Sequence, residues 1–295
     1  MRMLYSLTRG KSNKILSYPF KLKYKYDKSI STHKSDLNTY GYVNISPSEI
    51  SSSLVTVIKN KCKKLSVYNS AKYNQKKLIY SSFDKLKATN NFLYPRYIHF
   101  DYEVAAIPEV WQLIEHSKLI EIASSYLGCQ PLITNISSWY VTPLVNAINS
   151  EDLYSYSAQS YHYDVDWLSF LKVFINLDDV DSFNGPFEFL PYTHRGRSSK
   201  YYKDQRYTEL DKSAQPVFSK GPQGSIFIAD TSGLHRDGRA ISSTRQVLTI
   251  EFANSTFGGK YKIDENLSKL KETAPNLASV IPSSFYDSRA SKLLI

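Results

Sequence analysis

A histidine and an aspartate, His162 and Asp164, stand two residues apart in a segment rich in aromatic residues. In an extended segment, side chains at positions i and i+2 project from the same face, so this imidazole and carboxylate can converge on one ion. A second histidine, His235, lies 73 residues further on, shortly after the predicted strand 225–229. Two histidines and one carboxylate on one face of a metal leave its opposite positions open, which is the arrangement of non-haem iron(II) oxygenases. The spacing therefore predicts a metal site at His162, Asp164 and His235.

An arginine, Arg245, follows His235 by ten residues and stands at the head of the predicted strand 246–252. 2-Oxoglutarate, a co-substrate of such oxygenases, chelates the metal through its keto acid end, and its distal carboxylate must then be neutralised. A planar and permanently charged guanidinium suits that carboxylate bidentately. We therefore expect Arg245 to hold the distal carboxylate, while O2 takes a remaining open position on the metal.

Each of these residues also has an ordinary structural interpretation when it is taken alone. A His-x-Asp pair is common by chance, an isolated histidine is usually a satisfied structural residue, and an arginine at a strand end is more often a surface charge. The order of the features is more specific than any one of them: the pair, a β-rich insert, a strand that leads into His235, and Arg245 at the head of the next strand. His194 is interpreted as a turn residue and not as a ligand.

Short β-branched and aromatic runs, separated by Gly, Pro, Asn and Asp, dominate the chain after residue 131. We predict strands over the runs 132–141, 171–177, 187–190, 225–229 and 246–252. Another short strand is predicted over 40–45. Helices that come first and strands that come afterwards favour a β-sandwich or jelly roll with helices packed outside it.

Two helices are predicted before these strands. Residues 46–49 read Ser-Pro-Ser-Glu, which has the N-cap serine, N1 proline and N3 glutamate of a capping box, so a helix should follow to about Leu65. A second helix should begin near Pro108 and end before Gly128, a residue suited to a C-terminal stop. Both are interpreted as packing helices.

Two blocks of the sequence resemble the phytanoyl-CoA dioxygenase family of 2-oxoglutarate oxygenases. The first block comprises residues 158–164, 171–180, 184–186 and 190–195, and the second comprises 221–227, 230–238 and Arg245. The resemblance implies that His162, Asp164 and His235 bind Fe(II) and that Arg245 binds the 2-oxoglutarate carboxylate. It also implies a fold that is mainly β with flanking helices, a double-stranded β-helix (a cupin-like jelly roll) with N-terminal helices.

Several positions depart from the family pattern or leave two interpretations open. Tyr192 stands where the family usually has a glycine, and no residue in 132–142 can be assigned as a further 2-oxoglutarate contact. Phe174 is either a core aromatic or a border of the co-substrate site. Lys172 shares its strand face with Phe174, so it either faces the cavity and binds substrate or is an edge lysine.

The implied reaction is hydroxylation of a C–H bond of a small organic substrate, with 2-oxoglutarate converted to succinate and CO2. Halogenating relatives lack the carboxylate ligand, and Asp164 fills that position here, which argues against halogenation. One alternative is a non-catalytic metal-binding jelly-roll module. Another is a nucleic-acid-binding protein that uses its basic N-terminal half, although the sequence contains no nucleic-acid-binding motif.

The charge of the chain is unevenly distributed. Residues 1–100 contain 19 Lys and Arg against 4 Asp and Glu, a net +15, whereas the remainder is −5. This asymmetry indicates an acidic substrate or partner, or else general solubility. We expect a basic N-terminal arm over 1–38, irregular or forming a first strand, and a single oxygenase domain over 39–295.

The two cysteines, Cys62 and Cys129, lie in unlike contexts and predict neither a disulfide framework nor a cysteine zinc site. No apolar run approaches the ~18 residues that a bilayer span requires. A cytoplasmic setting is therefore expected.

Overall fold

The computed structural model describes residues 28–70, 78–89, 92–116, 118–144, 150–196, 210 and 213–255. Its helices are α2 (Lys28–Tyr40), the 3-10 turn η1 (Pro47–Glu49), α3 (Ser52–Cys62), α4 (Phe83–Ala88), α5 (Asp101–Ala105), α6 (Pro108–His116), α7 (Leu119–Leu127) and α8 (Ser150–Tyr156). Its strands are β1 (Tyr42–Ile45), β2 (Val67–Asn69), β3 (Ile79–Tyr80), β4 (Arg96–His99), β5 (Leu132–Val141), β6 (Phe170–Asn176), β7 (Glu188–Phe189), β8 (Val217–Phe218), β9 (Ile226–Ala229), β10 (His235–Arg236) and β11 (Arg245–Ala253).

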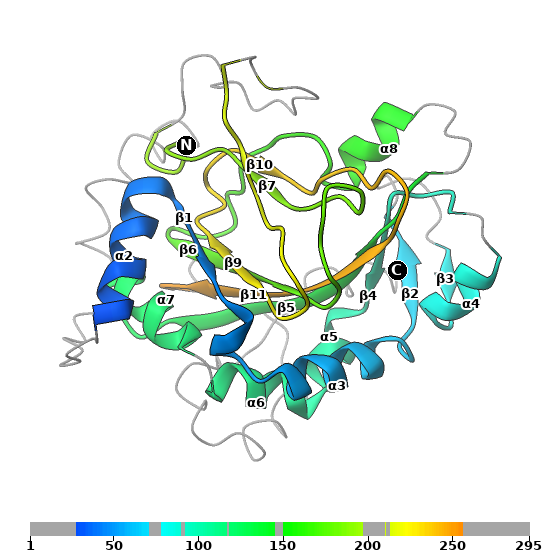
Figure 1. Cartoon of the computed structure of the whole chain (residues 1–295), viewed down its shortest axis with the longest axis horizontal. Coiled ribbons are helices and arrows are strands. Elements are labelled where there is room, and N and C mark those ends of the chain that lie inside the picture. The colour runs from blue at the N-terminus through cyan, green and yellow to red at the C-terminus, as the bar shows by residue number, and fades with distance from the viewer. Residues whose placement is uncertain are drawn as a thin grey trace.

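The described strands form two antiparallel sheets (Figure 1). The larger has the order β1-β9-β6-β11-β5-β4-β2-β3, and the smaller has the order β10-β7-β8. Trp139 and Phe174 of the large sheet share one apolar cluster with Phe187 and Phe189, which lie in and beside β7 of the small sheet. The two sheets therefore face each other as the walls of a double-stranded β-helix, and the predicted fold, mainly β with flanking helices, is confirmed.

Helices cover the other face of the large sheet (Figure 1). A single apolar cluster joins this face to α2, α3, α6 and α7, and Trp111 and Ile122 are among its buried members. On β11, for example, Leu248 and Ile250 point toward the helices, while Val247 and Thr249 point toward the cavity between the sheets. This alternation follows from the two-residue period of a strand.

The strand predictions agree with the structure to within two residues at each end. The predicted run 132–141 is β5, 171–177 is β6, 187–190 contains β7, 225–229 contains β9 and 246–252 lies within β11. The predicted run 40–45 contains β1. The short strands β2, β3, β4, β8 and β10 were not predicted, because two to four residues carry too little periodicity to stand out.

The two predicted helices are each interrupted. Ser46 accepts a hydrogen bond from the Ser48 amide, but it caps only the short turn η1, and Ile50 returns to an extended conformation. Helix α3 begins after a second cap, in which Ser51 accepts from the Leu54 amide. The predicted helix that starts at Pro108 is in fact α6 followed by α7, and it ends as expected, with Gly128 in the left-handed conformation at φ 73°.

Residues 28–38 form most of helix α2, so the expectation of an irregular arm or a strand over 1–38 is wrong for this part. Ile30 and Leu37, which lie seven residues apart and hence on one helical face, are completely buried in the cluster beneath the sheet. Burial of these two apolar side chains stabilises the helix, although the segment contains few apolar residues. Residues 1–27 and 256–295 lie outside the described residues, so the division into an arm and a domain stays a prediction.

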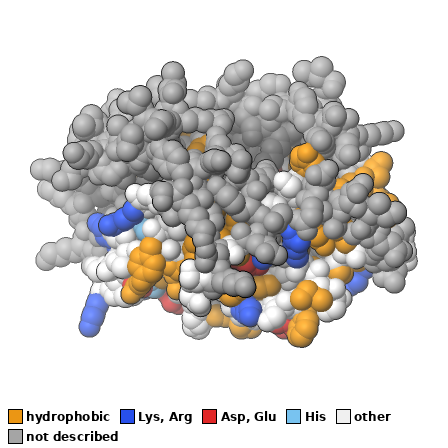
Figure 2. Space-filling view, turned by 90° about the horizontal axis from the view of Figure 1, so that it is seen from above, with side chains coloured by type: hydrophobic (Ala, Val, Ile, Leu, Met, Phe, Trp, Pro, Cys, Tyr) orange, Lys and Arg blue, Asp and Glu red, His pale blue; other side chains and the backbone are white. Residues whose placement is uncertain are grey.

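The described part of the chain shows no helix with the length and apolarity needed to cross a bilayer. In the view from above, the hydrophobic side chains of the described residues lie among polar and charged ones instead of forming one continuous patch (Figure 2). Both cysteines are buried and unpaired.

His99 makes the stability of this fold dependent on pH. Its Nδ1 donates to the Ser66 carbonyl at 3.0 Å, and burial lowers its pKa from 6.5 to about 4. Between these two values the unfolded chain binds the additional proton, so the free energy of unfolding should fall as the pH is lowered through this window. The buried neutral His99 should therefore make the free energy of unfolding ~3 kcal/mol larger above pH 6.5 than it is below pH 4.

Replacing His99 by glutamine keeps a donor for Ser66 but removes the titrating group. Urea unfolding at several pH values should therefore show a smaller loss of stability between pH 7 and pH 4 for this variant than for the wild type. Identical pH dependence in the two proteins would contradict the neutral, buried state of His99.

Candidate metal centre

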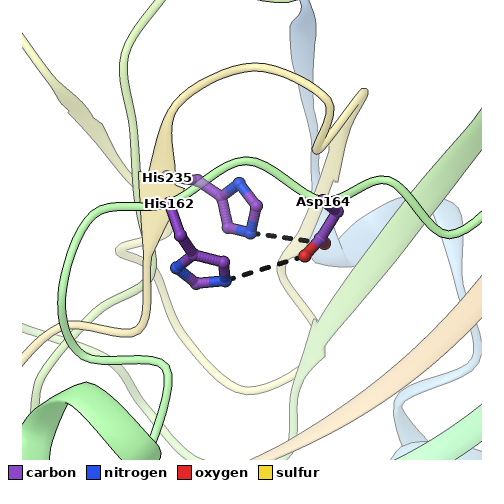
Figure 3. Close-up of side chains that lie close together, drawn as sticks. All are labelled: His162, Asp164 and His235. Carbon is purple, nitrogen blue, oxygen red and sulfur yellow. Dashed lines mark ion pairs between the residues drawn. The ribbon is translucent and has the colours of Figure 1, made fainter. Parts of the chain in front are cut away.

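The side chains of His162, Asp164 and His235 point toward one another (Figure 3). His162 Nε2 lies 3.6 Å from Asp164 Oδ1, and His235 Nε2 lies 3.4 Å from Asp164 Oδ2. All three candidate ligand atoms lie within 4.8 Å of one another. Two atoms that each bind one ion at ~2.1 Å are at most ~4.2 Å apart, so both histidine-to-carboxylate separations suit a shared ion.

The other ring nitrogen of each histidine is held by a backbone carbonyl. His162 Nδ1 donates to Ser160 O at 2.8 Å, and His235 Nδ1 donates to Gly233 O at 2.9 Å. A carbonyl can only accept, so each Nδ1 carries the proton and each Nε2 presents a lone pair toward Asp164. This second contact is the one that usually orients a metal-binding histidine and fixes its tautomer.

Backbone hydrogen bonds hold the three ligand segments together. The His162 amide donates to His235 O at 2.9 Å and the His235 amide donates to His162 O at 3.0 Å, so the two residues form an isolated antiparallel bridge. The Asp164 amide donates to Thr231 O at 2.9 Å. The predicted extended conformation around His162 is therefore present, and residues 73 apart in sequence are fixed side by side.

Lys172 lies at the centre of a carboxylate cluster beside the two histidines. Its Nζ is 2.7 Å from Asp164, 2.8 Å from Asp166 and 3.3 Å from Glu251. Burial alone would raise the pKa of Asp164, but the positive charge of Lys172 holds that pKa well below its usual value. Asp164 is therefore an ionised ligand at neutral pH.

The charge of this cluster fits a divalent cation. Asp164 and Asp166 carry two negative charges against one positive charge on Lys172. Burial raises the pKa of Glu251, which adds a third negative charge when it is ionised, so the net charge of the cluster is −1 to −2. Two imidazoles and one carboxylate are the donors that iron(II) accepts in oxygenases. The donor set and the local charge therefore both fit such an ion.

A cavity of about 120 Å³ opens next to the cluster. It is lined by Arg96, Asn135, Ser137, Trp139, Ala158, His162, Asp164, Lys172, Phe174, Phe187, His235, Asp237, Thr249 and Glu251. Phe174 stacks on Phe187 at 4.0 Å between ring centroids, so it is both a core aromatic and a wall of the cavity. Lys172 likewise faces the cavity and is not an edge lysine, because β6 lies between β9 and β11.

Arg245 is buried at the start of β11 and is not among the residues that line this cavity. Its Nε donates to Gly185 O at 2.6 Å, and its Nη2 donates to Asp237 Oδ1 at 2.9 Å. The other Asp237 oxygen accepts from Trp139 Nε1 at 2.8 Å and lies 3.5 Å from Arg96 Nη1. Asp237 thus already supplies the anion that a buried guanidinium needs.

The loop that passes Arg245 depends on two glycines. A Cβ atom at Gly185 would lie 2.6 Å from Gly238 O, and one at Gly238 would lie 2.1 Å from Pro186 O. Neither contact is compatible with a side chain. The Asn-Gly-Pro segment and the loop after His235 can therefore lie close enough together for Gly185 O to reach Arg245.

Two other sequence interpretations concern the turn after β7. His194 is buried, and its Nε2 lies 3.3 Å from Asn38 O, so it contacts helix α2 and is not part of the candidate metal cluster. Tyr192 occupies the left-handed region at φ 67°, the conformation for which a glycine is usually chosen. Its exposed ring packs edge-on against Tyr40.

Sequence reasoning did not identify Arg96, Trp139, Asp237 or Glu251 as cavity residues. Glu251 had a detectable signal, because it shares a strand face with Arg245 by the period of two. Asp237 stands two residues after His235 but lies beyond the end of β10. Arg96 had none. It comes from the short strand β4, and only its pairing with β5 brings it to the cavity.

No protein-family model and no curated protein matches the sequence, whereas solved structures do match. The epimerase SnoN in complex with Fe3+, alpha ketoglutarate and nogalamycin RO is 11% identical, with a TM-score of 0.51 over 77% of this chain and 84% of that chain. EvdO2 from Micromonospora carbonacea var. aurantiaca, complexed with 2-oxoglutarate, is 15% identical, with a TM-score of 0.51 over 75% of this chain and 89% of that chain.

The non-heme alpha ketoglutarate dependent carbocyclase SnoK from nogalamycin biosynthesis is 15% identical, with a TM-score of 0.50 over 77% of this chain and 84% of that chain. At these identities the three likenesses establish the fold.

Proposed function

We propose that this chain is a non-haem oxygenase that depends on iron(II) and 2-oxoglutarate. The observation that carries the proposal is the convergence of His162 Nε2, His235 Nε2 and the Asp164 carboxylate, with both histidine tautomers set by backbone carbonyls. The fold that the chain shares with SnoN and EvdO2, whose complexes contain Fe3+ or 2-oxoglutarate, supports the same proposal.

The metal ligands in this proposal are His162, Asp164 and His235, and the bound iron would supply the oxidising chemistry with O2. The protein's own task is to fix these ligands and keep water out. Phe174 and Phe187 make one wall of the cavity apolar, and Phe187 also packs against the His235 ring at 5.4 Å.

Arg245 remains our proposal for the group that binds the distal carboxylate of 2-oxoglutarate. It lies on the inward face of β11, and its Nη1 makes no hydrogen bond within the described part of the chain. Asp237 competes for the same guanidinium. Arg96 and Lys172 are the two basic side chains, histidines aside, that line the cavity directly, so they are the alternatives that an affinity measurement must separate.

Membership of the phytanoyl-CoA dioxygenase family is part of the proposal. It rests on the two sequence blocks around the metal ligands and on Arg245 ten residues after His235. Within this class we favour hydroxylation of a C–H bond of a small organic molecule. The same fold occurs in an epimerase and a carbocyclase, SnoN and SnoK. Hydroxylation is therefore one of several reactions that the fold supports, and it is the one that we propose.

The proposed activity can be tested by measuring succinate release. The purified chain should convert 2-oxoglutarate to succinate when iron(II) and O2 are present, with a rate that rises when a suitable small molecule from a metabolite library is added. Omitting iron(II) or O2 should remove the signal. A chain that binds iron(II) but never releases succinate would favour the non-catalytic metal-binding module instead.

A further inference from the structure

A second cavity, of about 280 Å³, lies on the opposite face of the large sheet from the metal site. It is lined by Lys59, Lys63, Phe83, Asp84, Lys87, Tyr140, Asp178, Thr244 and Gln246. Tyr140 and Gln246 are paired neighbours on β5 and β11, and they alternate with Trp139 and Arg245, which point toward the other side. The same two strands therefore form walls of two separate cavities.

The lining of this second cavity has an excess of positive charge. Lys59 pairs with Asp178 Oδ1 at 2.6 Å, and Asp178 Oδ2 accepts a hydrogen bond from the Gln246 backbone amide at 2.7 Å. Both oxygens of this carboxylate therefore already have a partner. Lys63, at the C-cap of α3, and Lys87, in α4, have no ion-pair partner among the described residues. Only Asp84 remains to offset these two ammonium groups.

Two buried polar atoms in the same lining also lack a partner. The Tyr140 hydroxyl, on a side chain that is 5% exposed, and Gln246 Oε1, on a side chain that is 0% exposed, make no hydrogen bond among the described residues. The Tyr140 ring is fixed by stacking on Phe83 at 3.5 Å, so the hydroxyl cannot easily turn away. Buried atoms of this kind are normally satisfied by water or by a ligand.

These groups together describe one class of ligand. Lys63 and Lys87, which have no ion-pair partner in the described part of the chain, are point charges of the kind that bind phosphate. The Tyr140 hydroxyl can donate to a phosphate oxygen, and Gln246 Oε1 can accept only from a donor such as an alcohol. We propose that this cavity binds a small phosphorylated alcohol, with the phosphate near Lys63 and Lys87 and an alcohol hydroxyl on Gln246.

This inference accounts for part of the positive charge of the N-terminal half. Lys59, Lys63 and Lys87 all belong to residues 1–100, and none of them contacts the metal-site cavity. A phosphate site requires a local cluster of this kind, whereas nucleic-acid binding requires an extended basic face. The site is independent of iron and 2-oxoglutarate, so it can be tested in the metal-free protein.

Glycerol 1-phosphate is a suitable probe, with inorganic phosphate and citrate as comparisons at constant ionic strength. Isothermal titration calorimetry should show saturable binding of glycerol 1-phosphate at one site, weaker binding of inorganic phosphate, and little binding of citrate. Each lysine has a matched control, because Lys64 and Lys85 are exposed neighbours outside the cavity. Lys63→Gln and Lys87→Gln should each weaken binding at least ~10-fold, while Lys64→Gln and Lys85→Gln change it less than ~2-fold.

Tyr140→Phe separates a ligand role from a structural role. It keeps the ring on Phe83 and removes a hydroxyl that lacks a partner, so the unliganded variant should be at least as stable as the wild type while it binds the probe at least ~10-fold more weakly. Three results would each overturn the proposal: no saturable binding of either phosphate compound, equal losses in the cavity variants and their controls, or undiminished binding by Tyr140→Phe. Tighter binding of citrate than of glycerol 1-phosphate would likewise contradict the assignment to phosphate.

Discussion

Replacing Asp164 by alanine is expected to weaken iron(II) binding by more than ~100-fold and to remove succinate release. Loss of residues that merely support metal ligands already costs ~10–100-fold, and Asp164 would itself be the anionic ligand. The variant should still fold, because Lys172 keeps Asp166 and Glu251 as partners at 2.8 and 3.3 Å. Anaerobic iron(II) titration followed by chromatography and metal analysis would measure the change.

The matched control for Asp164 is Asp166→Ala. Asp166 carries the same charge and contacts the same lysine at 2.8 Å, yet it is not part of the histidine cluster. Its removal should change iron(II) affinity by only a few-fold, since only the local field changes. Equal losses in the two variants would mean that general negative charge, and not direct ligation by Asp164, holds the metal.

The second large effect is expected at Arg245, where leucine should lower the free energy of unfolding by ~3–5 kcal/mol. The reason is that breaking a buried ion pair removes compensation that the remaining charge needs, and Arg96, 3.5 Å from the other Asp237 oxygen, supplies only part of it. Asp237 is 4% exposed, and its Oδ1 would lose the Arg245 contact of 2.9 Å. Urea unfolding would measure the loss, and a double variant, Arg245→Leu with Asp237→Asn, should recover a large part of it. A single variant as stable as the wild type would contradict the buried pair.

The same Arg245→Leu variant tests which cation binds 2-oxoglutarate. If Arg245 holds the distal carboxylate, the apparent Kd for 2-oxoglutarate should rise at least ~10-fold, or ~1.4 kcal/mol, with iron(II) binding little changed. Measurements belong below the unfolding transition, where the variant is folded. An unchanged Kd would reject Arg245, and losses in Arg96→Leu or Lys172→Met would then identify the replacing residue.

The residues of the metal cluster could be predicted from sequence because their signals are local. His162 and Asp164 are related by the two-residue period of an extended segment, and the strand before His235 is a continuous apolar run. The long strands β5, β6 and β11 were predictable for the same reason. Their burial on both faces makes them rich in β-branched and aromatic residues over seven to ten positions.

The remaining residues of the cavity depend on tertiary structure. Arg96 reaches the cavity only because β4 pairs with β5, and Asp237 takes its role from the arginines and tryptophan that surround it. The pairing of Arg245 with Asp237 could not be inferred from spacing, since a distance of eight residues across a loop fixes no contact. Helix α2 was likewise missed, because only two buried residues, Ile30 and Leu37, hold it to the core.

The central claim is that His162, Asp164 and His235 hold an iron ion that 2-oxoglutarate can chelate. The most direct test is an anaerobic titration of the iron(II)-loaded protein with 2-oxoglutarate, followed by the weak visible absorption of the chelate. We predict a saturable band with one 2-oxoglutarate per chain in the wild type, and no band in Asp164→Ala at the same concentrations. A wild-type protein that binds iron(II) but develops no band, or an Asp164→Ala variant with an undiminished band, would contradict this account.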